Sequence, residues 1–354
     1  MAKRAEPYVP GLQVNEPNII KLNTNENPYP PSPKVLSAIQ AEAEGKLQLY
    51  PSPTADELRT TIGSYYGLTA DEVFIGNGSD EVLAFSFMAF FEPGKKIRYP
   101  NITYSFYPVY AKLFDISYEE VPVNEDFTLP IEAFFHSDGG VILPNPNAPT
   151  SLYTELEHIE AIVKNNPDQV VIIDEAYVDF SNGSAAALVK KYDNLLVIQT
   201  TSKSRSLAGL RVGFALGNES LIKALIRMKD SFNSYTIDRL ALVGAKATFE
   251  DVAYFKEITE RIITTREKVT EQMKALGFNV LKSQANFIFA SHEEYTAQFL
   301  YTKLREHGVL VRHFNQEPID NFLRITIGAD EDMAQFFIKL KKIMGVSSSA
   351  ETAK

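Results

Sequence analysis

The chain has 354 residues, a formal net charge of -10 and no cysteine. That length suits one large α/β domain plus a smaller one. The negative charge disfavours a nucleic-acid partner, since phosphate backbones are bound by clustered lysines and arginines. The lack of cysteine excludes disulfides and thiolate metal sites.

The sequence also disfavours secretion, membrane insertion and metal binding. MAKRAEPYVPGLQVNEP starts with basic residues but lacks the apolar core of a signal peptide, and no stretch approaches 18 uninterrupted apolar residues. The five histidines, at positions 136, 158, 292, 307 and 313, show no ligand spacing. We therefore expect a cytoplasmic protein with no metal and no membrane association.

The first 50 residues are rich in proline and asparagine, as in LNTNENPYPPSPKV. This composition predicts an extended arm that leads to one short helix near Lys34 to Glu44. We expect residues 1–50 to form an amino-terminal arm and part of a small domain. Such an arm can reach a partner subunit.

Between about Thr54 and Phe249, short β-rich runs alternate with helical patterns. Several runs are apolar throughout, which is typical of a sheet covered by helices on both faces. We predict a large α/β domain over 51–249 with a mostly parallel sheet. The predicted strands are 73–76, 96–100, 140–144, 170–177, 195–200 and 211–217.

The last part of the chain, 250–354, has the pattern of a small α+β domain. A long helix from about Val252 to Leu276 leads into FNVLKSQANFIFA. There follow a helix within EEYTAQFLYTKLREHG, the strands VLVRHF and FLRITIG, and a last helix from Glu331 to Met344. We expect the polar tail GVSSSAETAK to be frayed.

One candidate site follows the first strand of the large domain. VFIGNGSDEVLAF predicts a strand, a glycine turn at Gly78, and a helix that begins near Ser79 and Asp80. The N–H groups at a helix start attract anions. Taken alone, a turn at Gly76 and Gly78 and a helix cap at Asp80 are the favoured explanation of these residues. The motif is neither a P-loop nor a dinucleotide G-x-G-x-x-G sequence.

Other polar or aromatic residues follow other strand ends. Asp174 and Glu175 end the apolar run VVIID, Asn147 lies in VILPNPNAPTS, and Tyr104 lies in RYPNITYSFY. Ligands bind at the carboxyl ends of strands in open α/β sheets. A buried Asp174 would need a positive partner, whereas a solvated one would not. Turn geometry and core packing are sufficient explanations for Asn147 and Tyr104 taken singly.

TTSKSRSLAGLRVGFALG, residues 200–217, completes the set. Lys203 lies near the end of an apolar strand, where a lysine can attack a carbonyl carbon. Thr200, Ser202 and Arg211 could hold a phosphate. Together with Tyr177, the strand-end residues supply what pyridoxal phosphate requires: an imine-forming lysine, an acid for the ring nitrogen, donors to the phenolic oxygen and phosphate anchors.

These residues resemble those of the fold-type I pyridoxal-phosphate aminotransferases and, within that group, the histidinol-phosphate aminotransferase family. The resemblance covers nearly the whole chain, from KLNTNENPYPPSP through LYPSPTADELR, GNGSDE, YPNITYSFY, NPNAPTS, IIDEAYVDF and SKSRSLAGLRVGFALG to FLRITIG. It implies a Schiff base between Lys203 and the cofactor, with the same lysine later moving the substrate proton. Asp174 would keep the pyridine nitrogen protonated.

The resemblance also assigns the other cofactor contacts. Tyr177 and Asn147 would hydrogen-bond the phenolic oxygen, and Tyr104 would stack on the ring. The phosphate would be held by Gly78, Ser79, Asp80, Thr200, Ser202 and Arg211.

The remaining implied roles concern a partner subunit and the substrate. In a homodimer, Tyr50 of LYPSP would reach the phosphate in the neighbouring subunit. Arg324 in FLRITIG and Arg312 in VLVRHF would grip the anionic group of the amino donor. Asn25 and Tyr8 would lie near the substrate.

The implied reaction transfers the amino group of L-histidinol phosphate to 2-oxoglutarate by a ping-pong mechanism in histidine biosynthesis. It gives imidazole acetol phosphate and glutamate. Alternatives are an aromatic amino acid aminotransferase of the same fold, a threonine-phosphate decarboxylase, and a non-catalytic binding protein. The sequence departs from the family after Lys203, where Ser204, Arg205 and Ser206 replace a small residue and an aromatic one. Arg205 lies either near the lysine or outside the pocket, which bears on substrate selectivity.

Overall fold

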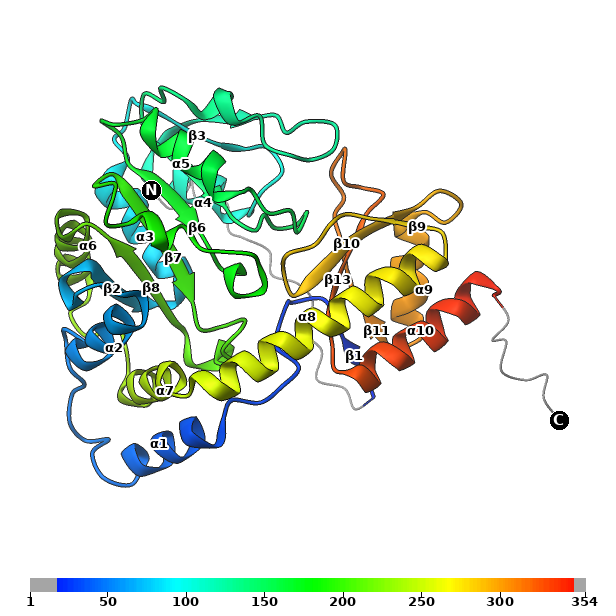
Figure 1. Cartoon of the computed structure of the whole chain (residues 1–354), viewed down its shortest axis with the longest axis horizontal. Coiled ribbons are helices and arrows are strands. Elements are labelled where there is room, and N and C mark those ends of the chain that lie inside the picture. Colours follow the sequence, from blue (N-terminus) through cyan, green and yellow to red (C-terminus); the bar gives the residue numbers. More distant parts are fainter. Residues whose placement is uncertain (1–17, 347–354) are drawn as a thin grey trace.

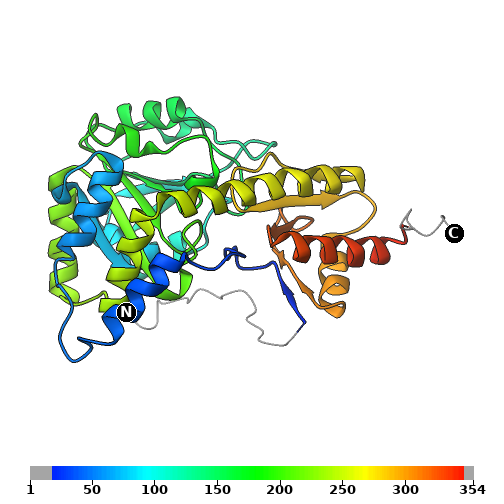
Figure 2. The same cartoon turned by 60° about the horizontal axis from the view of Figure 1, so that its bottom comes forward.

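The computed structural model describes residues 18–346, so Tyr8 lies outside the described residues. These residues form two lobes, and the long helix α8 (Val252–Ala275) runs from one to the other (Figure 1; Figure 2). The short helix predicted near the amino terminus is present as α1 (Pro33–Ala43). It begins there because the Ser32 side chain accepts a hydrogen bond from the Val35 N–H and a proline occupies its first turn.

The large lobe is built on a seven-stranded sheet with the order β2-β8-β7-β6-β5-β3-β4. Within this sheet β8 runs opposite to the other six strands, so the predicted mostly parallel sheet is confirmed. The strands are β2 (Val73–Asn77), β3 (Lys96–Pro100), β4 (Ser117–Val121), β5 (Val141–Pro144), β6 (Val171–Asp174), β7 (Leu195–Thr200) and β8 (Val212–Gly217).

Helices cover both faces of this sheet, as the apolar strands predict. Along β6, Val171 and Ile173 belong to the core on one face, and Ile172 belongs to the core on the other. The first face packs against α2 (Asp56–Tyr66), α5 (Leu156–Lys164) and α7 (Arg239–Glu250). The second packs against α3 (Gly78–Phe90), α4 (Phe106–Phe114) and α6 (Glu219–Phe232).

The small lobe contains a four-stranded antiparallel sheet with the order β12-β13-β10-β9. Its core also includes Ile20 and Leu22, because the amino-terminal strand β1 pairs with β11. The elements are β1 (Ile20–Lys21), β9 (Phe278–Val280), β10 (Phe287–His292), α9 (Ala297–Glu306), β11 (Val309–Leu310), β12 (Arg312–His313), β13 (Leu323–Thr326) and α10 (Asp330–Met344). The domain boundaries at residues 50 and 249 remain a prediction.

Several strands differ from the sequence-based expectation. The predicted strand 170–177 ends at Asp174, and β1 was not predicted. VLVRHF is not one strand but two, because the chain changes partner at Val311: β11 pairs with β1 and β12 pairs with β13. Strand β4 was not predicted. It is an edge strand with exposed Ser117, Glu119 and Glu120, so it lacks the apolar run that marks the buried strands.

Short 3-10 turns complete the fold at Ala70–Glu72, Ile131–Phe134, Val178–Phe180, Ala185–Leu188 and Ala208–Leu210. No helix within residues 18–346 is both long and apolar enough to cross a membrane. The same part of the chain contains no group of three or more side chains placed to hold a metal ion.

Candidate active site

A cavity of about 410 Å³ is lined by three parts of the chain. They are the segment 23–26, the loops after the strands of the large sheet, and Arg312, Phe314 and Arg324 of the small lobe. The predicted site residues that line this cavity are Asn25, Ser79, Asp80, Tyr104, Asp174, Tyr177, Thr200, Ser202, Lys203, Arg211, Arg312 and Arg324.

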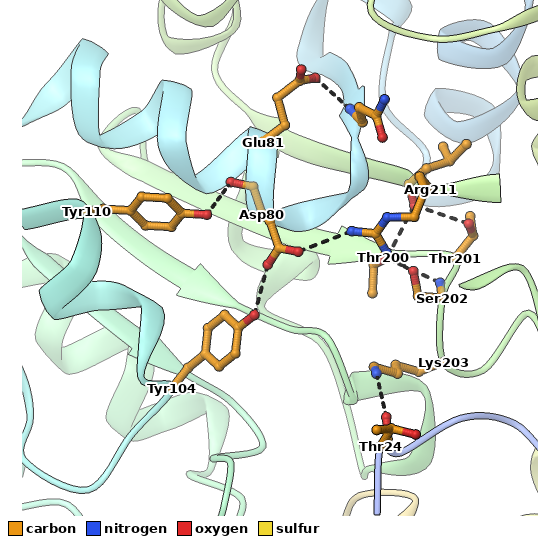
Figure 3. A network of polar contacts seen from close by, with 12 residues as sticks. Thr24, Asp80, Glu81, Tyr104, Tyr110, Thr200, Thr201, Ser202, Lys203 and Arg211 are labelled. Carbon is orange, nitrogen blue, oxygen red and sulfur yellow. Dashed lines mark hydrogen bonds and ion pairs between the residues drawn. The ribbon is translucent and has the colours of Figure 1, made fainter. Parts of the chain in front are cut away.

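Lys203 lies in the loop that follows β7. Its Nζ donates to the Thr24 carbonyl oxygen at 3.3 Å and lies 5.8 Å from the ring centroid of Tyr177 (Figure 3). The Asn27 side chain donates to the carbonyl oxygens of Lys203 and Ser204 at 3.0 and 3.1 Å. The loop is thus held by the amino-terminal segment while the amine of Lys203 lines the cavity.

The start of α3 has the shape of an anion cradle, and two glycines make it possible. Gly78 has φ +78°, and a Cβ there would lie 2.5 Å from Nη2 of Arg211. A Cβ at Gly213 on β8 would lie 2.3 Å from the Ser79 nitrogen. Only glycine allows this close approach of Arg211 and β8 to the helix start. The helix N–H groups and the guanidinium form a setting that suits a phosphate.

Two hydroxyls lie beside the arginine of this cradle. Thr200 Oγ1 lies 3.0 Å from Ser202 Oγ and donates to the Val212 carbonyl oxygen at 3.2 Å. Figure 3 shows both hydroxyls next to Arg211. Since both residues line the cavity, they can add donors to the same anion site.

The Asp80 carboxylate contacts two other residues of the cavity wall, which the sequence did not predict. Its Oδ2 lies 3.1 Å from Nη2 of Arg211, and its Oδ1 accepts a hydrogen bond from the Tyr104 hydroxyl at 2.9 Å (Figure 3). The Tyr110 hydroxyl donates to the Asp80 carbonyl oxygen at 2.8 Å. A carboxylate so placed repels a phosphate, so the N–H of Asp80 is the group suited to hold one.

Asp174 ends β6 and lines the cavity with a buried carboxyl group. Oδ2 accepts a hydrogen bond from the Tyr107 hydroxyl at 2.9 Å, while Oδ1 has no partner among the described residues. Burial raises the pKa of Asp174 to about 7; the Tyr107 hydrogen bond opposes this shift, and the negative charge of Asp80 adds to it. A buried oxygen without a donor in such a place is suited to meet a cation.

The neighbouring carboxylate, Glu175, does not line the cavity. It accepts hydrogen bonds from the Ser184 hydroxyl at 2.5 Å, the Ala185 N–H at 2.6 Å and the Gln199 amide at 2.8 Å. Burial raises the pKa of Glu175 to about 7 against these bonds. Because successive residues at a strand end point in opposite directions, one carboxylate serves the cavity and the other links β6 to β7.

The small-lobe wall carries two arginines. Arg312 and Arg324 are directly opposite each other on the antiparallel strands β12 and β13. Arg324 Nη2 donates to the Asn23 carbonyl oxygen at 2.9 Å, and both guanidinium groups lie within 6 Å of the Phe314 ring centroid, at 5.6 and 5.7 Å. Like charges directly opposite each other are destabilising, so an anion between them would be stabilising.

Asn25 joins the amino-terminal segment to both lobes. Its Nδ2 donates to the Tyr177 hydroxyl at 3.0 Å, and its Oδ1 accepts from Thr326 Oγ1 at 3.0 Å. Its own N–H donates to the same threonine oxygen at 3.0 Å, and its φ is +54°. These contacts place Asn25 beside Tyr177 in the cavity wall.

Three predicted cofactor residues are not in the cavity wall: Gly78, which directly precedes Ser79, and Asn147 and Tyr50. The Asn147 amide donates to the Ile102 carbonyl oxygen at 3.1 Å and to Thr150 Oγ1 at 2.8 Å, and its Oδ1 is buried without a partner in the described chain. Tyr50 is 78% exposed, and its ring centroid lies 4.7 Å from that of Tyr235. The predicted roles of Asn147 and Tyr50 remain predictions.

Arg205 lies outside the cavity, which decides between the two placements that the sequence allowed. Its guanidinium carbon lies 3.7 Å from the ring centroid of Phe249 and 4.0 Å from that of Phe255. Nη1 donates to the Thr248 carbonyl oxygen at 3.1 Å. A guanidinium stacks favourably on aromatic rings, so these two rings at the junction of α7 and α8 hold the Arg205 side chain outside the cavity.

Sequence reasoning missed some residues of the site. Tyr107, Thr24 and Glu26 were not singled out, although Tyr107 holds Asp174 and the other two line the cavity. The only signal for Tyr107 is its position three residues after Tyr104, and the two rings pack edge-on against each other. Glu26 pairs with Lys21 at 2.7 Å, a contact that no motif predicts.

Comparison with known proteins identifies the family. Residues 17–340 match the aminotransferase class I and II family. The chain belongs to this family. It is an aminotransferase rather than a non-catalytic binding protein, so Lys203 and its surroundings form the candidate catalytic centre of an enzyme.

Individual relatives of this aminotransferase are close in sequence. It is 58% identical to histidinol-phosphate aminotransferase 1 of Oceanobacillus iheyensis over 344 residues, which cover 97% of each chain. It is 56% identical to histidinol-phosphate aminotransferase of Clostridium beijerinckii over 97% of this chain and 96% of the relative. The crystal structure of histidinol-phosphate aminotransferase from Sinorhizobium meliloti in complex with pyridoxal-5'-phosphate is similar, with a TM-score of 0.83 at 23% identity over 92% of this chain and 90% of that one. This likeness shows the shared fold-type I architecture.

Proposed function

We propose that this aminotransferase moves the amino group of L-histidinol phosphate to 2-oxoglutarate in histidine biosynthesis, giving imidazole acetol phosphate and glutamate. The observation that carries the proposal is the single cavity in which Lys203 and the buried Asp174 face the opposed Arg312 and Arg324. Both amino donors, histidinol phosphate and glutamate, carry an anion for these arginines. Relatives named histidinol-phosphate aminotransferase, 56% to 58% identical, support the same substrate.

The cavity residues fit pyridoxal 5'-phosphate as the cofactor. The unpartnered Oδ1 of Asp174 suits a ring N–H, and the glycine-lined start of α3 beside Arg211 suits a phosphate. When bound, pyridoxal phosphate supplies an electron sink for the bond broken at the substrate α-carbon. The protein's own contribution is binding, orientation and proton transfer.

On the ring side of the cavity, each residue would have a distinct task. Lys203 would hold the cofactor covalently and, once released, carry the proton from the substrate α-carbon. Asp174 would keep the ring nitrogen protonated through a charge-assisted hydrogen bond. Tyr177 would donate to the phenolic oxygen, and Asn147 would do so in exchange for one of its hydrogen bonds to Ile102 and Thr150. Tyr104 would stack on the ring face.

On the phosphate side, donors would come from two segments that meet at the helix start. The N–H groups would surround the phosphate while Arg211 exchanged part of its contact with Asp80 for the new anion. The proposed phosphate-binding residues are Gly78, Ser79, Asp80, Thr200, Ser202 and Arg211.

On the substrate side, Arg324 and Arg312 would hold the phosphate of histidinol phosphate in one half-reaction and the carboxylates of glutamate or 2-oxoglutarate in the other. Asn25 lies beside Tyr177 and would therefore contact the substrate. Tyr8 is proposed to contact it as well. Using the same arginines for both substrates is consistent with a ping-pong mechanism.

We further propose a homodimer located in the cytoplasm. The exposed Tyr50 would reach the cofactor phosphate in the partner subunit. Exposed apolar side chains in the loop that contains Tyr50, at the end of α6 and in the loop after it support an interface there, since large exposed apolar groups mark contact sites. They are Leu47, Leu49, Tyr50, Phe232 and Tyr235.

The deciding experiment is a substrate comparison with the purified protein and added pyridoxal phosphate. We expect histidinol phosphate to convert the bound cofactor to its amino form, seen as a change in visible absorbance, far more efficiently than phenylalanine does. Equal conversion by phenylalanine would favour an aromatic aminotransferase. Release of carbon dioxide from threonine phosphate would favour a decarboxylase.

A further inference from the structure

Three tyrosines spaced three residues apart, Tyr104 just before α4 and Tyr107 and Tyr110 within it, hold the two acidic residues of the cavity wall. Tyr104 and Tyr110 donate to Asp80, one to its carboxylate and the other to its carbonyl oxygen. Tyr107 donates to Oδ2 of Asp174 at 2.9 Å. Tyr104 lines the cavity itself, whereas Tyr107 lies behind it and reaches the cavity only through Asp174.

Tyr107 is held rigidly in this position. Its side chain is fully buried, and its ring packs edge-on against Tyr104 at 5.8 Å and against Tyr99 at 6.0 Å between ring centroids. Close packing on both sides restricts ring movement, so the hydroxyl has a fixed direction. A rigid donor behind a carboxylate fixes the orientation of that carboxylate, as the outer partners of metal ligands do.

We propose that Tyr107 is a positioning residue that holds Oδ2 of Asp174 so that Oδ1 meets the ring nitrogen of pyridoxal phosphate. The inference rests on the proposed function, because it assumes that cofactor in the cavity. One oxygen of Asp174 is occupied by the Tyr107 hydroxyl and the other has no partner among the described residues. A carboxylate fixed on one side can accept a ring N–H on the other with little loss of conformational freedom.

The same hydrogen bond also affects the charge of Asp174. Burial favours the neutral carboxyl group, and the hydrogen bond from Tyr107 opposes this by stabilising the carboxylate. A neutral carboxyl group could not form a charge-assisted bond with a protonated ring nitrogen. Tyr107 therefore both orients the Asp174 carboxylate and favours its charged form.

The test is a comparison of two ligands on the full-length apo-enzyme. Tyr107→Phe removes only the hydroxyl. The dissociation constants of pyridoxal 5'-phosphate and of its 1-deaza analogue, which has carbon in place of the ring nitrogen, are measured by absorbance titration. We expect Tyr107→Phe to weaken pyridoxal phosphate binding about tenfold and binding of the analogue by less than about twofold.

Tyr99→Phe is the matched control, because Tyr99 is also buried and packs against Tyr107, but its hydroxyl makes no hydrogen bond to Asp174 or to any other described residue. It should change neither dissociation constant by more than about twofold. If Tyr107→Phe does not fold, Tyr107→His keeps a ring N–H donor and should keep the preference for pyridoxal phosphate over the analogue. A lost preference in that folded variant would overturn the proposal.

The other outcomes are equally decisive. Equal weakening of both ligands by Tyr107→Phe would make Tyr107 a general packing residue, and no weakening of either would leave it without a role at the ring nitrogen. Both results overturn the inference while the proposed function stands. A wild-type protein that binds neither ligand would instead overturn the proposed function, and the inference with it.

Discussion

The two walls of the cavity balance their charges in opposite ways. On the large-lobe wall, Arg211 faces Asp80, and Asp174 is held by a tyrosine. On the small-lobe wall, Arg312 and Arg324 are directly opposite each other. The first wall is internally paired and suits a resident cofactor of fixed structure. The second concentrates positive charge and suits anions that enter and leave in each half-reaction.

This difference matches how the walls are built. The large-lobe wall comes from loops that follow neighbouring strands of one sheet, so its groups are brought together by a single rigid element. The small-lobe wall combines residues from the neighbouring strands β12 and β13 with the amino-terminal segment 23–26. The wall built on one sheet is therefore the one proposed to hold the cofactor and carry out the chemistry. The wall built from two parts of the chain is the one proposed to bind and release substrates. Five substitutions test this contrast.

Loss of Lys203 should have the largest effect. Lys203→Ala removes the amine proposed to hold the cofactor and to move the proton. Because a positioned acid–base group alone contributes about 10²- to 10⁴-fold, turnover should fall by about 10⁴-fold. The visible absorbance of the linked cofactor should also disappear. Lys256→Ala, an exposed lysine on α8, is the control. Near-normal turnover in Lys203→Ala would contradict the proposed catalytic role of Lys203 and of the large-lobe wall.

Asp174→Asn tests the balanced wall through pH. The folded-state pKa of Asp174, about 7, lies above its ordinary value of 3.8. Below about pH 4 the carboxyl group is neutral in both the folded and the unfolded protein, so its burial costs little stability. As pH rises from about 4 to about 7, the unfolded protein gains the favoured charged form first, and the empty protein loses stability. Since one pKa unit is about 1.4 kcal/mol, the effect amounts to a few kcal/mol.

The measurement is urea unfolding of the cofactor-free protein at pH 5 and pH 8. Asp174→Asn should lose less stability over this interval than the wild type and should bind pyridoxal phosphate more weakly. Glu175→Gln is the control for cofactor binding, because Glu175 has a similar pKa but does not line the cavity. An unchanged pH dependence in Asp174→Asn would contradict the assigned burial cost.

Arg312→Met and Arg324→Met test the positive wall. Each should raise KM for histidinol phosphate by about 10- to 100-fold, because a charged hydrogen bond is worth about 1.5–3 kcal/mol. Neither substitution should lower the melting temperature of the empty protein, since each removes one of two like charges that lie directly opposite each other. Arg227→Met, an exposed arginine on α6, should change neither quantity. A large loss of stability with unchanged KM would show that these arginines serve the fold.

Asp80→Asn should have the smallest effect. The Asp80–Arg211 pair is about half exposed, so removing it should change the free energy of unfolding by less than about 1 kcal/mol. The neutral side chain should no longer compete for Arg211, and inorganic phosphate should bind the empty protein a few times more tightly. Calorimetric titration measures this change. Weaker phosphate binding would mean that the contribution of Asp80 to positioning Arg211 outweighs its repulsion of the phosphate.

Much of the large lobe follows from local sequence. The strand at 195–200 agrees with the expected residues because an apolar run bounded by turns specifies a buried strand. The strand at 96–100 also agrees, although Lys96 and Arg98 interrupt its apolar residues. β4 escaped prediction because an edge strand needs no apolar run. The split of VLVRHF depends on which partner each half meets, and no local pattern records a partner.

The site divides in the same manner. Residues after strand ends, such as Asp174 and Lys203, were predictable because the ends of parallel strands meet at one edge of a sheet. The direction of Arg205 was not, because aromatic rings at the α7–α8 junction draw its guanidinium away. Tyr107 was missed because its hydroxyl meets an acceptor 67 residues further along the chain.

The sequence by itself therefore determined the kinds of chemical groups, their order after successive strands, and through these the family. The tertiary structure alone decided which donor meets which acceptor: Tyr107 with Asp174, Asn25 with Tyr177, and Arg312 opposite Arg324. Local sequence sets backbone conformation through short-range steric and hydrogen-bonding preferences. Contacts between distant segments depend on strand register and packing across both lobes, and these are properties of the whole folded chain.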